Sequence, residues 1–216
     1  MYIKDWMSSE VATVTPDDPV TVAIKLMREK DIRHLPVVEK GVLVGILSDR
    51  VIKDYLPSEA TTLDIFELHY LLGQVKVAKI MRTPVFAAAP DTPVEEAALL
   101  LHDHQISCLP VVEAGKVVGI ITDKDMYAAL IHITGVKQDG HRICLVLADE
   151  AGSIREAGDI VRKHGFGLES ILSSHAFTAP GQRMVVIRTR GQGDFAALRK
   201  ELLTHYPGAD IRPGRP

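Results

Sequence analysis

Apolar residues along the first 130 positions change their spacing in a fixed order. A helix is predicted first, because apolar side chains recur every three or four residues; these are Val20, Ala23, Ile24 and Met27. Two β-branched runs follow, Leu35–Val38 and Leu43–Leu47, and the turn-forming residues Glu39 to Gly41 lie between them. This pattern predicts a hairpin. A short helix over about Asp49–Leu56 closes the unit.

The same pattern occurs a second time. Met1–Leu56 is matched, without insertion or deletion, by Val75–Leu130, 74 positions later. The first helix of the second copy carries the equivalent apolar face, made of Val94, Ala97, Ala98 and Leu101. Two copies imply two equivalent β-α-β-β-α units that bury their sheets against helices. If a pseudo-twofold axis relates them, a cleft forms between them, and such clefts bind small molecules.

Each copy also contains a signal for the start of its first helix. Asp18 and Thr92 are predicted to be N-caps, which places Pro19 and Pro93 at the first helical position, where no amide is needed. In the second copy, Thr92 and Glu95 have the spacing of a capping box. Between the copies, an apolar stripe in DIFELHYLLG predicts a helix within residues 57–74 that packs on the module.

After Leu130 the pattern changes to that of a different fold. Strands and helices alternate in the order βαββαβ, which predicts a ferredoxin-like unit. The predicted elements are a strand at His141–Leu147, a helix at Ile154–His164, strands at Leu168–His175 and Met184–Arg190, a helix at Asp194–Thr204 and a strand at Ala209–Arg212. The fold class is therefore α/β of the α+β kind, in two parts.

Composition excludes several classes of function. The net charge of −3 and the scattered basic residues do not indicate a nucleic-acid or polybasic membrane surface. Cys108 and Cys144 lack metal-ligand spacing, and with only two cysteines a disulfide framework is not expected. The N-terminus lacks the apolar core of a signal peptide, and no run approaches the length of a membrane span. We therefore expect a soluble cytoplasmic protein without a metal site.

The two copies resemble cystathionine-β-synthase (CBS) motifs. The hallmarks are IRHLPVVEKGVLVGILSDR in the first copy and ISCLPVVEAGKVVGIITDKD in the second. The resemblance implies a disc-like module, commonly dimeric, that binds AMP, ATP, S-adenosylmethionine or a related adenosine compound. The expected domains are CBS repeats at residues 1–56 and 75–130, a helical linker at 57–74, a second linker at 131–140 and a C-terminal domain at 141–216.

The C-terminal segment LVLADEAGSIREAGDIVRKHGFGLESILSS resembles an ACT domain. In that family, an acidic residue and a glycine in the first strand-to-helix turn, here Asp149 and Gly152, often adjoin an amino-acid site at a dimer interface. Gly152 is equally explained by the backbone freedom that the turn requires. The order CBS, CBS, ACT is similar to that of the acetoin utilisation protein B family, and it implies a link to acetoin or carbon metabolism.

The CBS resemblance assigns candidate ligand residues, most of them in the second copy. Asp125 would accept hydrogen bonds from both ribose hydroxyls, because a carboxylate can pair with a vicinal diol; Thr122 would lie near the ribose or phosphate. Ile120 would contact adenine. The slot for the base would be lined by Ala89, Pro90, Ser107, Cys108 and Pro110. Asp125 has a structural alternative, since an acidic residue in the first turn of a helix also binds free amides.

The first copy departs from this pattern. Ser48 is present, but Val51 stands where the second copy has Asp125, and valine cannot bind a diol. We therefore expect one good site or two unequal ones. The first copy instead offers residues that could reach a phosphate bound in the second copy across the axis: Arg33, His34 and Arg50, together with Lys124 of the second copy itself.

Three functions remain open on these residues. The first is a regulatory module in which an adenosine ligand changes the angle between the repeats, and the change passes through residues 127–133 to an ACT dimer or to an unidentified regulated protein. The second is a dimerisation scaffold with vestigial pockets. The third, an enzyme, is disfavoured, because no nucleophile with a base, no phosphate loop and no metal spacing is present; His102 and His104 would point to different faces of a helix.

Overall fold

The computed structural model describes residues 1–55 and 73–214, which divide into one unit at residues 1–126 and another from residue 127 onward. Most of the helix expected within residues 57–74 lies outside the described residues. In the described part of the chain, no helix is both long and apolar enough to cross a membrane.

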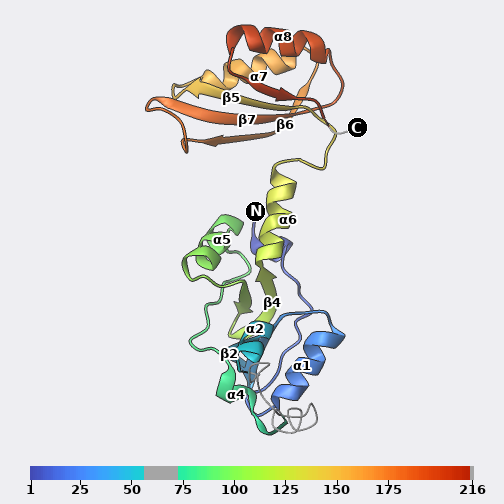
Figure 1. Cartoon of the computed structure of the whole chain (residues 1–216), viewed down its shortest axis with the longest axis vertical. Helices are drawn as coiled ribbons and strands as arrows, with labels where there is room; N and C mark the ends of the chain where they lie inside the picture. Colours follow the sequence, from blue (N-terminus) through green and yellow to red (C-terminus); the bar gives the residue numbers. More distant parts are fainter. Residues whose placement is uncertain (56–72, 215–216) are drawn as a thin grey trace, which may run out of the picture. The chain divides into compact units, whose positions relative to one another are not determined.

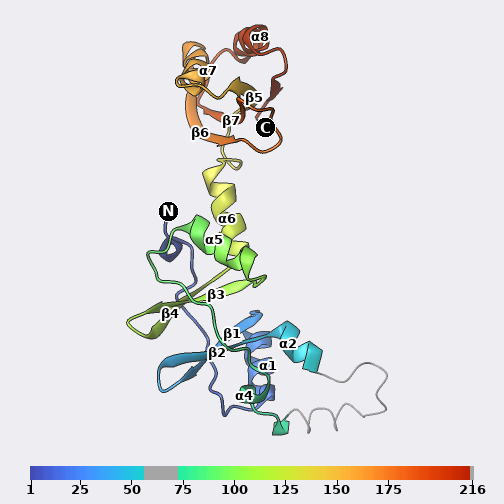
Figure 2. The same ribbon diagram turned by 90° about the vertical axis from the view of Figure 1, so that its left-hand side faces the viewer.

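The two repeats fold alike, as their sequences predict (Figures 1 and 2). The first contains α1 (Val20–Glu29), β1 (His34–Glu39), β2 (Val42–Ser48) and α2 (Asp49–Tyr55). The second contains α5 (Val94–Asp103), β3 (Cys108–Glu113), β4 (Lys116–Thr122) and α6 (Asp123–Ile133). β1 pairs with β2, and β3 with β4, in antiparallel hairpins that have the same register irregularity. The expected leading strand is reduced to one parallel bridge in each repeat, Val14 to Val37 and Ala88 to Val111.

The hairpin turns explain why a glycine is required. Lys40 and Gly41 both have positive φ, at 50° and 84°, and so do their equivalents Ala114 and Gly115, at 48° and 80°. Two successive positive φ angles are characteristic of a type I′ turn, whose twist matches that of the flanking strands. A side chain at the glycine position would be strained there.

The predicted helix N-caps were wrong by one residue. α1 and α5 begin after Pro19 and Pro93, which are the N-cap residues and make no side-chain capping bond. The side chains of Asp18 and Thr92 instead reach backwards, where they accept hydrogen bonds from the amides of Thr15 (2.6 Å) and Ala89 (3.1 Å). These two side chains therefore stabilise the turn before each helix, because short polar side chains bond to nearby backbone in turns as readily as at caps. The expected capping box of Thr92 with Glu95 does not form.

The two repeats exchange their leading segments. Tyr2 and Ser8 form bridges with Pro93 and Ile120 of the second repeat, while Lys76 and Arg82, the equivalent residues 74 positions later, form bridges with Pro19 and Ile46 of the first. Each leading segment is helical in part: η1 (Ile3–Asp5) in one and α4 (Val77–Ile80) in the other. This reciprocal pairing relates the repeats by the pseudo-twofold symmetry that their sequences predict.

The exchanged segments also complete the cores. Val77 and Ile80 are buried in the core of the first repeat, beside Val20, Leu35 and Leu47. Ile3 is fully buried on the other side of the exchange, where its backbone amide donates to the carbonyl of Thr92 (3.0 Å).

Two methionines hold equivalent positions in the exchange. Met81 lies against Gly45, and Met7 lies against Gly119, so closely that a Cβ at either glycine would overlap the thioether. Flexible methionine side chains fill irregular gaps of this kind well.

The C-terminal unit has the predicted βαββαβ order. Its elements are β5 (Arg142–Ala148), α7 (Ser153–Lys163), β6 (Gly167–Ser174), β7 (Gln182–Arg190), α8 (Phe195–His205) and β8 (Asp210–Arg212). The strands form one antiparallel sheet in the order β6-β7-β5-β8, and α7 and α8 cover one of its faces (Figure 1). This is the ferredoxin-like topology. Ile143, Leu145, Val185, Ile187 and Leu198 lie in its core.

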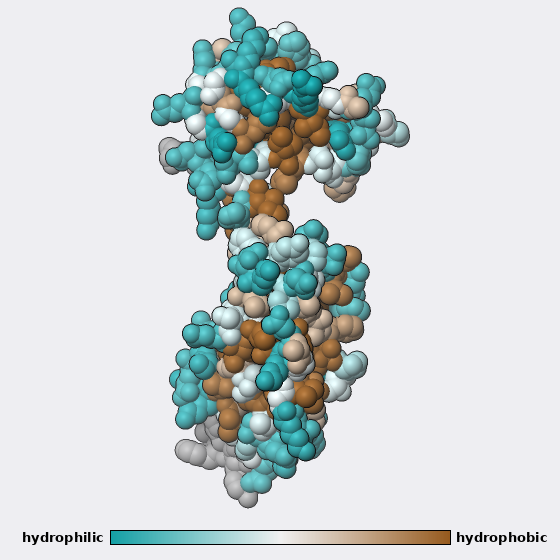
Figure 3. All heavy atoms as spheres, turned by 180° about the vertical axis from the view of Figure 1, so that it is seen from behind, coloured by the Kyte–Doolittle hydropathy of each residue, from teal (hydrophilic) through white to brown (hydrophobic). Residues whose placement is uncertain are grey.

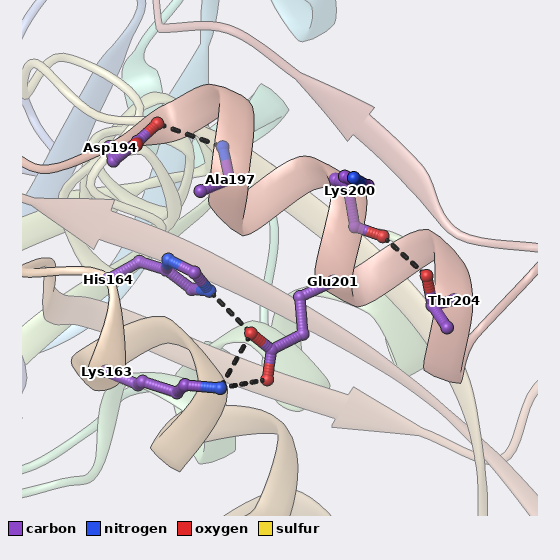
Figure 4. Close-up of polar contacts among 7 residues, drawn as sticks. All are labelled: Lys163, His164, Asp194, Ala197, Lys200, Glu201 and Thr204. Carbon is purple, nitrogen blue, oxygen red and sulfur yellow. Dashed lines mark hydrogen bonds and ion pairs between the residues drawn. The ribbon is translucent and has the colours of Figure 1, made fainter.

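The two helices of this unit are joined by a charged cluster (Figure 4). Glu201 on α8 accepts hydrogen bonds from Lys163 Nζ (2.9 Å to each oxygen) and pairs with His164 Nε2 (2.8 Å). Lys163 and His164 lie at the C-terminal end of α7, where the helix dipole favours a positive charge such as that of Lys163. Hydrogen bonds from Lys163 and His164 hold the pKa of the Glu201 carboxyl below its usual value.

We expect Ile3→Ala to destabilise the N-terminal unit by about 2–4 kcal/mol, because it removes a fully buried side chain although it lies at the third position of the chain. Trp6 is the only tryptophan and lies in the same exchanged segment, so urea unfolding followed by its fluorescence measures this unit. Leu99→Ala is the control, because Leu99 is 58% exposed on α5. An Ile3→Ala protein as stable as the Leu99→Ala protein would show that the exchanged segment does not contribute to the core.

Candidate functional site

The candidate residues gather where each hairpin runs into its closing helix. His34 at the start of β1 is opposite Ser48 at the end of β2, and Cys108 at the start of β3 is opposite Thr122 at the end of β4. The amides of Asp49 and Asp123 then donate to the carbonyls of Arg33 (3.0 Å) and Ser107 (3.2 Å), which fixes each helix start beside the strand entry.

Asp125 and Thr122 form one polar cluster in the second repeat. Oδ2 of Asp125 accepts hydrogen bonds from the backbone amide of Thr122 (2.7 Å) and from its hydroxyl (2.8 Å). The structural role that the sequence left open for Asp125 is therefore present. Among the described residues, Oδ1 makes no hydrogen bond, so this half-buried carboxylate keeps one oxygen with which to accept from a ligand.

The first repeat has no equivalent acceptor at this position. Ser48 Oγ accepts a hydrogen bond from the amide of Val51 (3.3 Å), and the Val51 side chain packs against the core of that repeat. Asp49 is paired with Lys53 (3.2 Å) on the same helix. The departure noted in the sequence thus has a structural counterpart: a core contact stands where the second repeat has a carboxylate.

His34 contacts the second repeat through a residue that the sequence assigned to the base slot. Its Nε2 lies 2.8 Å from Oγ of Ser107 in the second repeat. Burial lowers the pKa of His34, and this outweighs the opposing effect of the Asp49 and Asp123 carboxylates, while Arg33 lowers it further. Neutral imidazole is therefore favoured near pH 7.

The other candidate cations lie on the surface. Arg33 and Lys124 are exposed, and Arg50 is 3.9 Å from Asp54 one turn along α2, with a side chain that is 85% exposed. Between described residues, the side chains of these three make no hydrogen bond to the second repeat. Long flexible side chains of this kind can swing toward an anion, but of these candidates only His34 has a fixed contact across the axis.

The expected base slot has backbone groups that are partly used by the exchanged N-terminal segment. Pro90 accepts a hydrogen bond from the amide of Lys4 (3.0 Å), and Ile120 exchanges backbone hydrogen bonds with Ser8 (3.0 Å each). Pro110 is buried and accepts from Ala88 (3.1 Å), whereas Ala89 is exposed. Sequence reasoning missed Lys4 and Ser8 as neighbours of this slot. They are part of the first copy in the sequence, but in the fold they contact the second copy.

Cys108 contributes volume to the second repeat. The side chain is 6% exposed, and burial, together with the nearby Asp123 carboxylate, raises the pKa of its thiol to about 12. A protonated buried thiol behaves as a small apolar group and is a poor nucleophile. Among the described residues, no group of three or more His, Cys, Asp and Glu side chains could hold a metal ion.

The residues expected at an ACT-type site occupy the first strand-to-helix turn of the C-terminal unit. Gly152 has φ of 99° and precedes α7, so the backbone freedom invoked for it is required. The Asp149 carboxylate is 3.1 Å from both His175 Nε2 and Arg183 Nε. Each oxygen of the Asp149 carboxylate therefore already lies beside a basic side chain.

A family model for the CBS domain matches residues 3–58 and 77–132. These two ranges cover both repeats and end before the C-terminal sheet begins.

Similar proteins match a little over half of the chain. The CBS domain-containing protein YhcV of Bacillus subtilis is 36% identical over 124 residues, which make up 57% of this chain and 81% of YhcV. Homoserine O-acetyltransferase of Methanococcoides burtonii is also 36% identical, but the chain spans only 23% of that enzyme's length.

Two solved structures resemble the N-terminal part. A Vibrio cholerae protein named for acetoin utilization (AcuB) is 30% identical with a TM-score of 0.52, and the match covers 63% of this chain and 95% of that one. CBSX2 in complex with AMP is 29% identical with a TM-score of 0.51, covering 61% of this chain and 97% of that one. With both repeats matched over more than half of its residues, the chain belongs to the CBS-domain family as a protein with a tandem CBS pair.

Proposed function

We propose that the CBS pair is a regulatory module that binds an adenosine-containing ligand, of the AMP, ATP or S-adenosylmethionine class, chiefly in the second repeat. The observation that carries this proposal is the Asp125 carboxylate: Thr122 orients it through Oδ2, while Oδ1 is left to accept from a ribose hydroxyl. The related CBSX2 structure, which contains AMP, supports the ligand class.

The phosphate of such a ligand would be met from the first repeat. His34 already reaches Ser107 at 2.8 Å, so a group bound beside β3 lies within its range. Arg33, Arg50 and Lys124 are exposed and can add positive charge. A ligand bound in this way would contact both repeats, and it would shift their relative angle by its difference in affinity between the two arrangements.

The helix α6 provides the route for the signal. Asp125 lies in its first turn, and the same helix continues through residues 127–133, which belong to the C-terminal unit. The C-terminal unit is proposed to be ACT-like on its ferredoxin-like topology, with weak or no amino-acid binding at Asp149. The likeness to AcuB supports a role in acetoin or carbon metabolism.

A homodimer is proposed through the edge strand β6. Among the described strands it pairs only with β7, which leaves its other edge open, and Glu169 is its only charged residue. A nearly uncharged edge of this length offers backbone groups to a second copy. Figure 3 shows apolar side chains among the hydrophilic ones on the surface of this unit; Val146, on the sheet face opposite the helices, is 52% exposed.

We expect Asp125→Ala to weaken AMP binding at least about tenfold, because a charge-assisted hydrogen bond contributes about 1.5–3 kcal/mol. Isothermal titration calorimetry with AMP, ADP, ATP and S-adenosylmethionine measures this effect. Asp125→Asn separates the two roles of the residue, since its amide oxygen can still accept from Thr122 while its nitrogen cannot accept from a diol. Asp103→Ala, at an exposed aspartate of the same repeat, is the control. Unchanged affinity in Asp125→Ala would remove the ribose role.

Val51→Asp should create or strengthen binding in the first repeat, because it restores the missing carboxylate. Calorimetry should then show a second site or a tighter weak site. The substitution also places a charge against the core contact of Val51, so a lower melting temperature is expected alongside the gain. A variant that folds and binds no more ligand than the natural chain would show that the first repeat lacks more than this carboxylate.

Ile171→Lys should convert the dimer to a monomer, because it places like charges beside each other where two β6 edges meet. Sedimentation velocity would report a mass near 23.7 kDa in place of twice that value. Val22→Lys is the matched control, since Val22 is 45% exposed on α1 and Ile171 is 40% exposed. A natural chain that sediments as a monomer would contradict the proposed dimer.

Ligand screening also tests the alternative function. A ligand at 100 times its Kd adds about 2.7 kcal/mol of stability, a shift that is easily measured in a thermal scan. If no adenine compound shifts the melting temperature while the chain remains dimeric, the dimerisation scaffold replaces the sensor as the better account.

A further inference from the structure

A side-chain hydrogen bond joins the strand entries of the two repeats, and it involves a titratable group. His34 at the start of β1 lies 2.8 Å from Ser107, which directly precedes β3. The pseudo-twofold axis gives this contact no counterpart, because the equivalents of His34 and Ser107 are Cys108 and Arg33. The module therefore contains one such contact, and the other symmetry-related position lacks it.

The charged groups around His34 come from both repeats. Asp49 lies in the first turn of α2 and Asp123 in the first turn of α6, and both carboxylates act on the imidazole. Arg33 is its neighbour in sequence, and the buried Cys108 thiol remains neutral on β3. Lys53 pairs with Asp49 (3.2 Å), and its positive charge partly offsets the field of that carboxylate at His34.

We propose that the His34–Ser107 contact is a proton-sensitive clasp between the two CBS repeats, which holds while the imidazole is neutral and weakens when it takes up a proton. The neutral ring can use Nε2 either to donate to the serine hydroxyl or to accept from it, whereas the imidazolium can only donate. It must also place a charge in a partly buried position beside Arg33.

The direction of the pH dependence follows from burial. Since burial lowers the pKa of His34 below its ordinary 6.5, the folded module binds this proton less readily than the unfolded chain does. The stability that His34 contributes is therefore complete above pH 6.5 and declines as the pH falls from there through the lowered pKa. The proposed function places His34 beside the ligand's phosphate as well, so the clasp is tested without a nucleotide, where only the pairing of the repeats is measured.

The test uses the natural chain, with both units, and its His34→Gln variant. Glutamine keeps a hydrogen-bonding group but cannot titrate. We expect the unfolding midpoint of the N-terminal unit, followed by Trp6 fluorescence, to fall more in the natural chain than in His34→Gln between about pH 7.5 and about pH 5.5. His205→Gln, at an exposed histidine of the C-terminal unit, should behave like the natural chain.

A second measurement keeps the proposal testable if His34→Gln folds poorly. The proton NMR titration of the natural chain, with the His34 signal assigned from the shift that Ser107→Ala causes in it, should give a pKa below the ordinary 6.5. A His34 pKa at or above that value, or equal falls in midpoint for the natural chain and His34→Gln, would overturn the clasp. Neither result depends on whether AMP binds, so failure of the clasp and failure of the proposed sensor remain distinguishable.

Discussion

The exchange of leading segments is the constraint on which the N-terminal unit depends. Ile3 is buried on the second repeat, and Val77 is buried on the first, so neither hydrophobic core is complete without residues from the other end of the module. A sheet of two strands is marginal by itself. Among the described residues, each hairpin has its own two strands, one bridge to residues before its helix and one bridge to the exchanged segment. The exchange supplies apolar area that each hairpin lacks.

The functional asymmetry is built on this symmetric frame. The backbone is held in the same way at the starts of α2 and α6. In each repeat, the amide of the first aspartate of the helix donates a hydrogen bond to the carbonyl of the residue that precedes the first hairpin strand. Side chains then divide the roles: Val51 packs inward in one repeat, and Asp125 binds Thr122 in the other. A duplicated scaffold can thus keep its fold through shared backbone contacts while single side chains decide which copy carries polar chemistry.

Much of this fold could be predicted from the sequence, because apolar spacing determines which face of each element is buried. The hairpins, the helices and the βαββαβ order of the C-terminal unit agree with the periodicity to within a few residues. The helix starts were misassigned because the side chains of Asp18 and Thr92 can accept from amides before them or after them in the chain. The sequence alone does not show which of these hydrogen bonds is more stable. The exchange was not predicted because no local sequence pattern around Ile3 and Ser8 identifies a partner more than 80 residues away.

The candidate site could be predicted only in part. A motif resemblance pointed to Asp125 and Thr122, which the fold brings into contact, whereas the burial of Cys108 depends on packing that spacing does not encode.

The exchange also has a consequence for how the chain is made. Ser8 finds its backbone partner at Ile120, so the segment around Ser8 waits for more than a hundred further residues to be made before it can pair. Closing so long a loop is entropically slow, and contacts between distant residues lower folding rates. During synthesis, the first repeat therefore emerges before α4, which completes its core, and before the second repeat, to which its own leading segment binds. The two repeats should fold together in one cooperative step after α6 has been translated.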